Sequence, residues 1–254
     1  MAQVNPWDTA APANAFERAG GEYQDFRPSY PEASVAAALL GKTAPAVVDV
    51  GAGTGKFTEQ LLQAGATAWA VEPASAMREQ LLAAPWAGNP LLHVVDGTAE
   101  NTGLPSQIAD VITYAQSWHW VDPEAALTEA ARLLRPGGIV SIIFNQMDVS
   151  ISWVHRLTRI MRSGDIHTPQ KPPALAAGWE APSLHKTEFT SRLTPEGIKA
   201  LARTRSSYLK STAANREKMQ ANLQWYLLEH LGYSDTDLVE IPYYTLVWTT
   251  KPST

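Results

Sequence analysis

The stretch Val47-Val48-Asp49-Val50-Gly51-Ala52-Gly53-Thr54-Gly55 carries the strongest fold signal in the chain. Its apolar run predicts a short buried strand, its glycines predict a tight turn, and residues 56–64 predict a helix. Because glycine has no Cβ, the backbone of such a turn can approach a ligand closely. The following helix would direct its N-terminal amides at the same space, as happens where open α/β sheets bind nucleotide-like ligands.

The spacing of the glycines narrows the ligand class. Dinucleotide sites usually read G-x-G-x-x-G, which would place the third glycine at position 56. That position is Lys56, and the third glycine is Gly55, so the turn reads G-x-G-x-G with an acid, Asp49, two residues before it. This pattern favours an adenosyl amino acid, which needs room for a carboxylate, an ammonium and a sulfonium, over a pyrophosphate.

The segment Asp49–Gly55 resembles the first motif of the class I S-adenosylmethionine-dependent methyltransferases, and three further motifs follow in the family's order. These are an acid after the second strand, a polar-Ala-Glu turn before Leu-Pro, and Leu-Leu-Arg-Pro-Gly-Gly before the fifth strand; together they span residues 47–144. The resemblance implies an α/β fold with a Rossmann-like doubly wound sheet. That sheet is mostly parallel with an antiparallel C-terminal strand, plus a helical N-terminal lid and an insertion after strand five.

The resemblance also implies S-adenosylmethionine as cofactor and S-adenosylhomocysteine as product, bound by Asp49, Gly51 and Gly53. Glu72 ends the second predicted strand about 20 residues after the turn, and its two carboxylate oxygens can accept hydrogen bonds from both ribose hydroxyls. Pro73 and Met77, one turn apart on the next helix, can form an apolar wall for the adenine. The alternative is that Glu72 merely caps that helix.

Two side chains compete for the adenine amino group. In the family pattern a polar side chain reaches this group and the following alanine amide reaches a ring nitrogen. Thr98 and Ala99 occupy these positions, but Thr98 brings no charge and Asp96 can serve instead. The sequence leaves the two open, and turn chemistry is the alternative role for both.

The fourth predicted strand ends in Ala115-Gln116-Ser117-Trp118-His119-Trp120, and similar family members carry Ala-Gln and an aromatic-His-Trp run here. We therefore expect Gln116 beside the cofactor, and Trp118 and Trp120 in the acceptor pocket. His119 is the candidate general base, because histidine titrates near neutral pH. The alternative is that His119 only fixes this loop by a hydrogen bond.

The segments outside these motifs are expected to cover the site. Residues 16–31 resemble the N-terminal lid of small-molecule methyltransferases, with Tyr23 near the sulfonium, Arg27 on the cofactor carboxylate and Tyr30 in the substrate pocket. A packing aromatic and a solvated arginine are the alternative. The insertion 145–185 would roof the acceptor pocket with Trp153. Residues 203–208 resemble a pocket-contacting segment, and an exposed polar helix end is equally plausible.

These segments together predict a single domain over residues 1–254. It would comprise a lid at 1–41, a cofactor-binding core at 42–145, and an insertion with cap helices and terminal strands at 146–254. The late elements would be an edge strand at 187–193, helices starting near Pro195 and Ala214, and a final strand at 240–249. Pro242 in that final strand indicates an edge position.

Composition limits the other function classes. With 254 residues, 45% hydrophobic and 18% charged, the chain reads as a globular protein with a sizeable core. The net charge of −5 argues against a nonspecific nucleic-acid binder, and the lack of cysteine excludes disulfides and thiolate metal sites. No 18-residue apolar span or secretory signal is evident, so we expect a cytoplasmic protein without a membrane partner. His155 and His167 match no metal-ligand spacing, and the sequence gives no oligomeric state.

The sequence thus predicts an enzyme that transfers a methyl group from S-adenosylmethionine to a small-molecule acceptor by in-line displacement. A general base would be needed only for a hydroxyl, a protonated amine or an acidic carbon. Two alternatives stay open at this point. One is a binding module that holds the cofactor without methyl transfer. The other is a nucleotide-dependent dehydrogenase, against which Lys56 argues.

Overall fold

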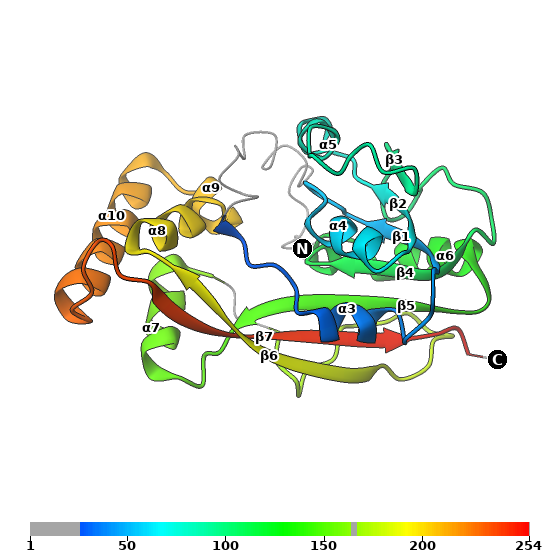
Figure 1. Ribbon diagram of the computed structural model, residues 1–254. Helices are drawn as coiled ribbons and strands as arrows, with labels where there is room; N and C mark the ends of the chain where they lie inside the picture. Colours follow the sequence, from blue (N-terminus) through cyan, green and yellow to red (C-terminus); the bar gives the residue numbers. More distant parts are fainter. Residues whose placement is uncertain (1–25, 164–166, 254) are drawn as a thin grey trace, which may run out of the picture.

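A single mixed sheet organises the molecule. The computed structural model describes residues 26–163 and 167–253, in which seven strands lie in the order β3-β2-β1-β4-β5-β7-β6 (Figure 1). The five strands that run parallel are β1 (Ala46–Val50), β2 (Thr67–Val71), β3 (Leu92–Val95), β4 (Ala109–Ala115) and β5 (Leu134–Met147). The last strand, β7 (Val239–Thr250), pairs antiparallel with β5 on one side and with β6 (Ser183–Leu193) on the other. The mostly parallel, doubly wound sheet predicted from the sequence is confirmed.

Helices cover both faces of the parallel strands. On one face lie α3 (Glu32–Ala38), α4 (Lys56–Gln63) and α5 (Ser75–Leu82), and on the other lies α6 (Pro123–Leu133). In β1, Val47 packs toward α3 and α4 while Val48 packs toward α6, so the strand is buried throughout. Strands buried on both faces are nearly continuous apolar runs, which is why residues 46–50 were recognisable without an alternating pattern.

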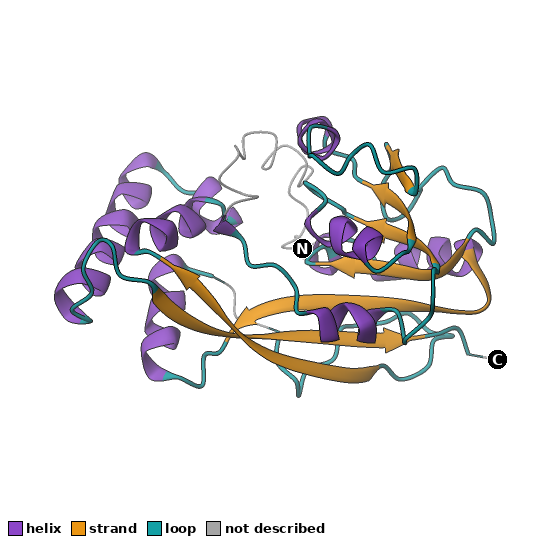
Figure 2. Ribbon diagram, viewed as in Figure 1, coloured by secondary structure: helices purple, strands orange, loops and turns teal. Residues whose placement is uncertain are grey.

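The remaining helices form a second group, at the far end of the long strands β5–β7 (Figure 2). They are α7 (Ser152–Met161), α8 (Pro195–Arg203), α9 (Ser206–Leu209) and α10 (Ala213–Gln224), which continues into the π-helix η2 (Trp225–His230). Their buried apolar side chains form a separate cluster that includes Val154, Leu157, Leu201 and Leu223. These helices therefore build a cap with its own core, whereas β6 and β7 from the same part of the chain extend the main sheet.

Local signals set where several of these helices begin. Asp122 accepts hydrogen bonds from the backbone N–H groups of Glu124 and Ala125 at the start of α6, and Pro123 occupies the first turn. At α8, the Thr194 side chain accepts from the Gly197 N–H, again with proline in the first turn. A side-chain acceptor before a proline is a strong helix start, since it satisfies otherwise unpaired amides.

Two expectations about the later elements were wrong in detail. The final strand is not at an edge: β7 lies between β5 and β6, and β6 is the edge strand. Pro242 is tolerated because it lies just past the last residue pair with β5, where its carbonyl accepts from Asp148. The fifth strand begins at Leu134, because the chain resumes pairing before the bulge at residues 135–138. The helix expected to start near Ala214 begins at Ala213 and continues with π geometry from Trp225.

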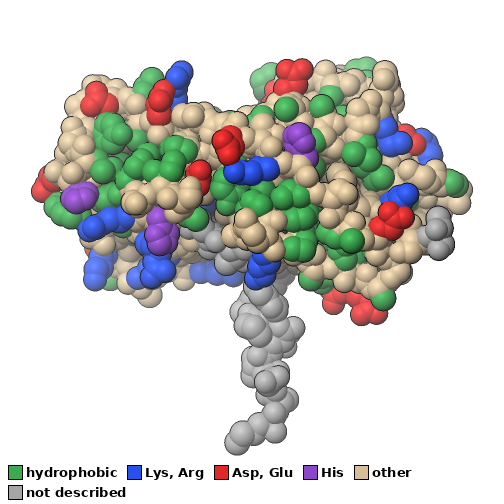
Figure 3. All heavy atoms as spheres, turned by 90° about the horizontal axis from the view of Figure 1, so that it is seen from below, with side chains coloured by type: hydrophobic (Ala, Val, Ile, Leu, Met, Phe, Trp, Pro, Cys, Tyr) green, Lys and Arg blue, Asp and Glu red, His purple; other side chains and the backbone are tan. Residues whose placement is uncertain are grey.

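The surface of the described residues carries charges of both signs. Acidic, basic and hydrophobic side chains are interspersed on the face seen from below (Figure 3). Among the described helices, none combines the length and the hydropathy needed to cross a bilayer.

Asp49 ties the centre of the sheet to α4. Its carboxylate is buried and accepts hydrogen bonds from the hydroxyls of Thr58 on α4, at 2.7 Å, and Thr113 on β4, at 2.8 Å. Thr113 is directly paired with Asp49 across the β1–β4 ladder, so the two side chains share a face. Burial raises the pKa of Asp49 to about 6, and the nearby charge of Glu72 adds to the rise, whereas the two threonine hydroxyls oppose it.

The raised pKa of Asp49 predicts a pH-dependent stability. The folded protein binds this proton more tightly than the unfolded chain, so the contribution of Asp49 to stability is fully present below its ordinary pKa of 3.8 and is lost as the pH rises through about 6. Relative to Asp49→Asn, the unmodified protein should gain roughly 1 kcal/mol of unfolding free energy between pH 7 and pH 5. Urea unfolding of both proteins at the two pH values measures this, and an equal change in both would contradict it.

Candidate functional site

A cavity of about 580 Å³ opens at the carboxyl ends of the parallel strands, between the sheet and the cap. Its lining brings together most of the predicted site residues, namely Arg27, Tyr30, Asp49, Gly51, Gly53, Glu72, Pro73, Met77, Thr98, Ala99, Gln116, His119 and Trp120. Clefts of this size at this edge of an α/β sheet are typical of small-molecule sites. Tyr23 lies outside the described residues.

The glycine turn is shaped for close approach of a ligand. Gly51 and Gly53 both adopt left-handed backbone conformations, with φ of +70° and +60°. A Cβ built on Gly51 would lie 2.5 Å from the Ser117 Cβ, whereas a Cβ on Gly53 would meet no atom within 4 Å. Ser117 is fixed there because its hydroxyl donates to the Val50 carbonyl at 2.6 Å. Gly51 therefore makes room for the protein itself, and Gly53 leaves room for a ligand.

Helix α4 begins at the same place without a side-chain cap. Its N-cap is Gly55, with φ of +84°, and no side chain accepts a hydrogen bond from the first turn. Lys56 and Phe57 at this end of the helix line the cavity. Uncapped amides and the positive end of the helix dipole favour a negatively charged group.

Glu72 connects the glycine turn to the start of α5. One carboxylate oxygen accepts from the Gly53 N–H at 2.8 Å and the other accepts from the Ala74 N–H at 2.9 Å. Burial raises the pKa of Glu72, and the two amides oppose that rise. Glu72 thus partly fills the alternative role considered from the sequence, in which it caps the helix that follows. Each carboxylate oxygen can accept a further hydrogen bond, so the ribose role stays a prediction.

Thr98 and Asp96 have different surroundings. The Asp96 carboxylate is exposed, pairs with both terminal nitrogens of Arg78 at 3.0 and 2.9 Å, and lies outside the cavity lining. Thr98 lines the cavity, although its hydroxyl also accepts from the Asn101 N–H at 3.2 Å as a turn residue does. The position of Thr98 therefore favours it over Asp96 as the polar partner of a ligand.

Polar contacts fix the loops around the cavity. Gln116 has a positive φ of 59° and donates from its amide to the Asn145 carbonyl at 2.9 Å. The Asn145 amide in turn donates to the Ser29 carbonyl at 3.1 Å, and the Tyr30 ring packs edge-on against Phe57 at 4.8 Å. A strained backbone held by several partners is common at functional sites.

Arg27 joins the N-terminal segment to the cap. Its guanidinium donates to the Thr204 hydroxyl and to the Thr204 carbonyl, both at 3.0 Å. Arg27 also lines the cavity, so a contact with a bound carboxylate stays a prediction.

Two histidines lie at the cap side of the cavity. His119 is on the short 3-10 helix η1 (Trp118–Trp120), and its ring centroid lies 6.0 Å from that of His167, which stacks on Phe144 at 3.6 Å. Burial lowers the pKa of His119 to about 4, with further lowering by His167 and Arg27. Burial also lowers the pKa of His167 to about 4, helped by Lys171. Both rings are therefore neutral at pH 7, and the buried Nδ1 of His119 has no hydrogen-bond partner among the described residues.

Two of the expected pocket residues lie elsewhere. Trp118 is buried in the main core and packs edge-on against Tyr114 at 4.9 Å, because η1 turns it toward the α6 side of the sheet. Trp153 packs on the core of the cap, and its carbonyl accepts from the Tyr226 hydroxyl at 2.9 Å. Neither lines the cavity, so the expectation that they form the acceptor pocket is corrected.

The cavity also contains residues that the sequence did not single out. These include Ser117, Asn145, Gln146, Arg162, Ser163, His167 and Tyr243. Asn145 lies near the carboxyl end of β5, so the carboxyl-edge rule for parallel sheets would have found it. Arg162 and His167 carry no such signal, because their insertion has no recognisable motif. Arg205, Ser206 and Ser207 belong to the segment 203–208, whose pocket role the sequence left open.

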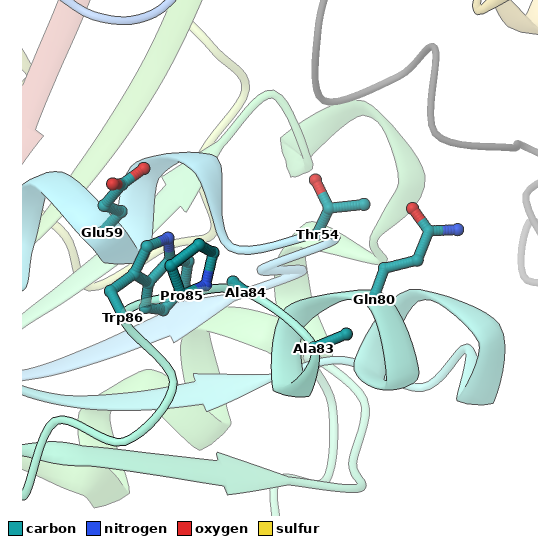
Figure 4. Close-up of a pocket in the computed structure, with 7 residues that line it drawn as sticks. All are labelled: Thr54, Glu59, Gln80, Ala83, Ala84, Pro85 and Trp86. Carbon is teal, nitrogen blue, oxygen red and sulfur yellow. The ribbon is translucent and has the colours of Figure 1, made fainter.

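A smaller hollow of about 470 Å³ lies beside the glycine turn, between α4 and the end of α5. Figure 4 shows its lining, with Trp86 and Pro85 beneath α4, Thr54 on the turn, Gln80 on α5 and Ala83 directly after α5. Glu59 is the one ionisable side chain among the described residues that line it. In the described part of the chain, no three His, Asp or Glu side chains are grouped to hold a metal ion. The larger cavity is therefore the candidate site.

Comparisons with known proteins show similarity to methyltransferases. Residues 48–142 match the family model described as a methyltransferase domain. The chain is 35% identical over 233 residues to an uncharacterized methyltransferase of Mycobacterium tuberculosis, covering 91% of this chain and 93% of the relative. An uncharacterized methyltransferase of Schizosaccharomyces pombe is 24% identical over 249 residues, covering 91% and 94%.

Solved structures share the fold. One, provisionally assigned as a type II methyltransferase from Anaeromyxobacter dehalogenans, superimposes with a TM-score of 0.63 at 24% identity, covering 88% of this chain and 97% of that one. Another is a methyltransferase from Geobacter sulfurreducens in complex with S-adenosyl-L-homocysteine, with a TM-score of 0.50 at 15% identity, covering 94% and 97%.

The two glycines predict a contrast in stability. Alanine at position 51 or 53 would have to adopt a left-handed backbone conformation, which destabilises the folded protein by about 1 kcal/mol. Gly51→Ala must also displace Ser117 and weaken its bond to Val50, so it should lose a further 1–3 kcal/mol or so relative to Gly53→Ala. Urea unfolding of the two variants measures the difference. Equal losses would mean that the contact with Ser117 does not restrict position 51.

Proposed function

This chain belongs to the class I S-adenosylmethionine-dependent methyltransferases, and we propose that it methylates a small-molecule acceptor held in the cavity at the carboxyl ends of its parallel strands. S-adenosylmethionine is the cofactor and S-adenosylhomocysteine the product. The observation that carries the proposal is the turn at Gly51–Gly55, which opens into this cavity and leads into an uncapped helix.

The residues present fit the cofactor. The open space at Gly53 and the uncapped start of α4 suit its amino acid portion, whose carboxylate is favoured by helix amides. Asp49 and Glu72 place carboxylates in the same lining, where they favour the ammonium and the ribose hydroxyls. Pro73, Met77, Thr98 and Ala99 surround the adenine.

Bound S-adenosylmethionine supplies a methyl group on a positively charged sulfur, which is already an activated donor. The protein then acts chiefly by holding the acceptor in line and excluding water. Neutral His119 positions the acceptor by a hydrogen bond from or to its ring. A pKa of about 4 makes His119 a weak proton acceptor at pH 7, so the positioning role is favoured over the general-base role. A cytoplasmic location and the lack of a nucleic-acid partner rest on the sequence and stay predictions.

Binding and turnover test this function separately. Calorimetry should detect binding of S-adenosylmethionine and of S-adenosylhomocysteine but no binding of NAD. Incubation of the protein and S-adenosylmethionine with a panel of small organic acceptors should then release S-adenosylhomocysteine. If S-adenosylmethionine binds but no acceptor in the panel leads to release of S-adenosylhomocysteine, the alternative of a binding module that holds the cofactor without methyl transfer would be favoured. Binding of NAD in place of S-adenosylhomocysteine would overturn the proposal.

Glu72→Ala should weaken S-adenosylhomocysteine binding roughly 10- to 100-fold. A hydrogen bond to a charged group is worth on the order of 1.5–3 kcal/mol, and the variant also releases the Gly53 amide from its partner. Glu79→Ala, which removes the same charge from the exposed face of α5, is the control and should bind normally. Calorimetry measures both, and unchanged affinity in a folded Glu72→Ala protein would refute the role.

The pH profile tests the role of His119. Because its pKa lies near 4, it stays neutral above about pH 5.5, and kcat should show no inflection from this ring between pH 5.5 and 8. His119→Asn, which keeps a hydrogen-bonding side chain, should reduce kcat without changing the shape of the profile. An inflection near neutral pH that disappears in the variant would instead establish the general-base role.

A further inference from the structure

The charges in the cavity are divided between its two ends. The acidic side chains among its described lining residues are Asp49, which lies in β1, and Glu72 and Glu100, which follow β2 and β3. The arginines are Arg27, Arg162 and Arg205, which belong to the N-terminal segment and the cap. The cofactor end therefore holds three carboxylates and one lysine, Lys56 at the start of α4, whereas the charged side chains of the cap end are arginines.

Arg162 is held at the end of α7. It takes a left-handed conformation, with φ of 48°, that stops the helix, a conformation unusual for a residue with a side chain. Just before it, the Met161 carbonyl accepts from the Ser207 hydroxyl at 3.1 Å. This bond joins the end of α7 to α9 and so brings the segments of Arg162 and Arg205 to the same wall.

Arg205 lies between two fixed neighbours. Thr204 before it receives both hydrogen bonds from Arg27, so two guanidinium-bearing segments meet here. On the other side, Lys210 at the end of α9 lies over the Trp120 ring at 5.2 Å, which places α9 against the aromatic run of η1. The charge of Arg27 also reaches His119 and contributes to the lowering of its pKa.

From this geometry we infer that the acceptor carries an oxyanion, a carboxylate or a phosphate, and that Arg162 and Arg205 bind it at the cap end of the cavity. Planar guanidinium groups match the geometry of such oxyanions and bind them in a bidentate way. The Ser206 hydroxyl on the same wall is a further donor.

The remaining lining selects the body of the acceptor. Trp120, Tyr30 and Tyr243 offer apolar surface with polar edges, and the neutral ring of His119 lies among them. An organic acid or phosphate ester with an apolar or aromatic body fits both features. This inference rests on the proposed function, because it names the chemistry of the molecule that the same cavity would methylate.

The experiment uses the full chain saturated with S-adenosylhomocysteine. Phenylacetate, phenyl phosphate and the neutral phenylacetamide are titrated at millimolar concentrations and followed by calorimetry. At least one anion should bind ten or more times more tightly than the amide, and the two anions distinguish a carboxylate acceptor from a phosphate. Added salt should weaken the binding of the two anions but not the binding of the amide.

Variants identify the arginines. Arg162→Gln and Arg205→Gln should each lower the affinity for the anion at least tenfold, while the affinities for phenylacetamide and S-adenosylhomocysteine stay unchanged. The lysine substitutions at both positions keep the charge and should retain part of the affinity. Arg159→Gln is the matched control, because Arg159 lies one turn earlier on α7, is exposed and does not line the cavity.

Several outcomes would overturn the inference while leaving the proposed function intact. These are equal binding of anion and amide, no heat from either anion, or unchanged anion binding in both glutamine variants, each with normal S-adenosylhomocysteine binding. Failure of the unmodified protein to bind S-adenosylhomocysteine would instead overturn the proposed function. Thermal melting of each variant shows whether it is folded, and unchanged S-adenosylhomocysteine affinity shows that its cofactor end is intact.

Discussion

The buried carboxylate of Asp49 is the contact on which the site depends. It holds Thr58 of α4 and Thr113 of β4 at once, so it fixes where the helix begins relative to the two central strands. The glycine turn spans the short gap between these fixed points and has little freedom of its own. An ionised carboxylate in this position is costly, which is expressed in its raised pKa, and the two hydroxyls recover part of that cost.

A second set of hydrogen bonds fixes the other loops that surround the cavity. Ser117 holds the Val50 carbonyl and thereby closes the space that a side chain at Gly51 would need. Gln116 donates to Asn145, which donates to Ser29, so hydrogen bonds join the ends of β4 and β5 to the N-terminal segment. Hydrogen bonds between polar side chains at the strand ends thus hold the loops of the site in place, as apolar packing holds the core.

The cap lines the cavity with a different set of side chains from those of the parallel strands. The parallel strands contribute acids and small residues, which suit a cofactor with hydroxyl and ammonium groups. The cap contributes arginines and hydroxyls through the ends of α7 and α9, which are joined by the bond from Ser207 to Met161. Burial keeps His119 and His167 uncharged between these ends, so they add hydrogen-bonding capacity without adding to the positive charge.

The sequence by itself determined the sheet, its winding and the cofactor end. The apolar run 46–50, the glycines after it and Glu72 some 20 residues later act through backbone conformation and chain order, which are local properties. Only the tertiary structure decided that Trp120 faces the cavity while Trp118 enters the core, and that Thr98 rather than Asp96 lines it. It also brought Arg162 and Arg205 to one wall from separate helices of the cap. Which side chains meet across such distances depends on the packing of the whole cap, and no short pattern in the chain encodes that.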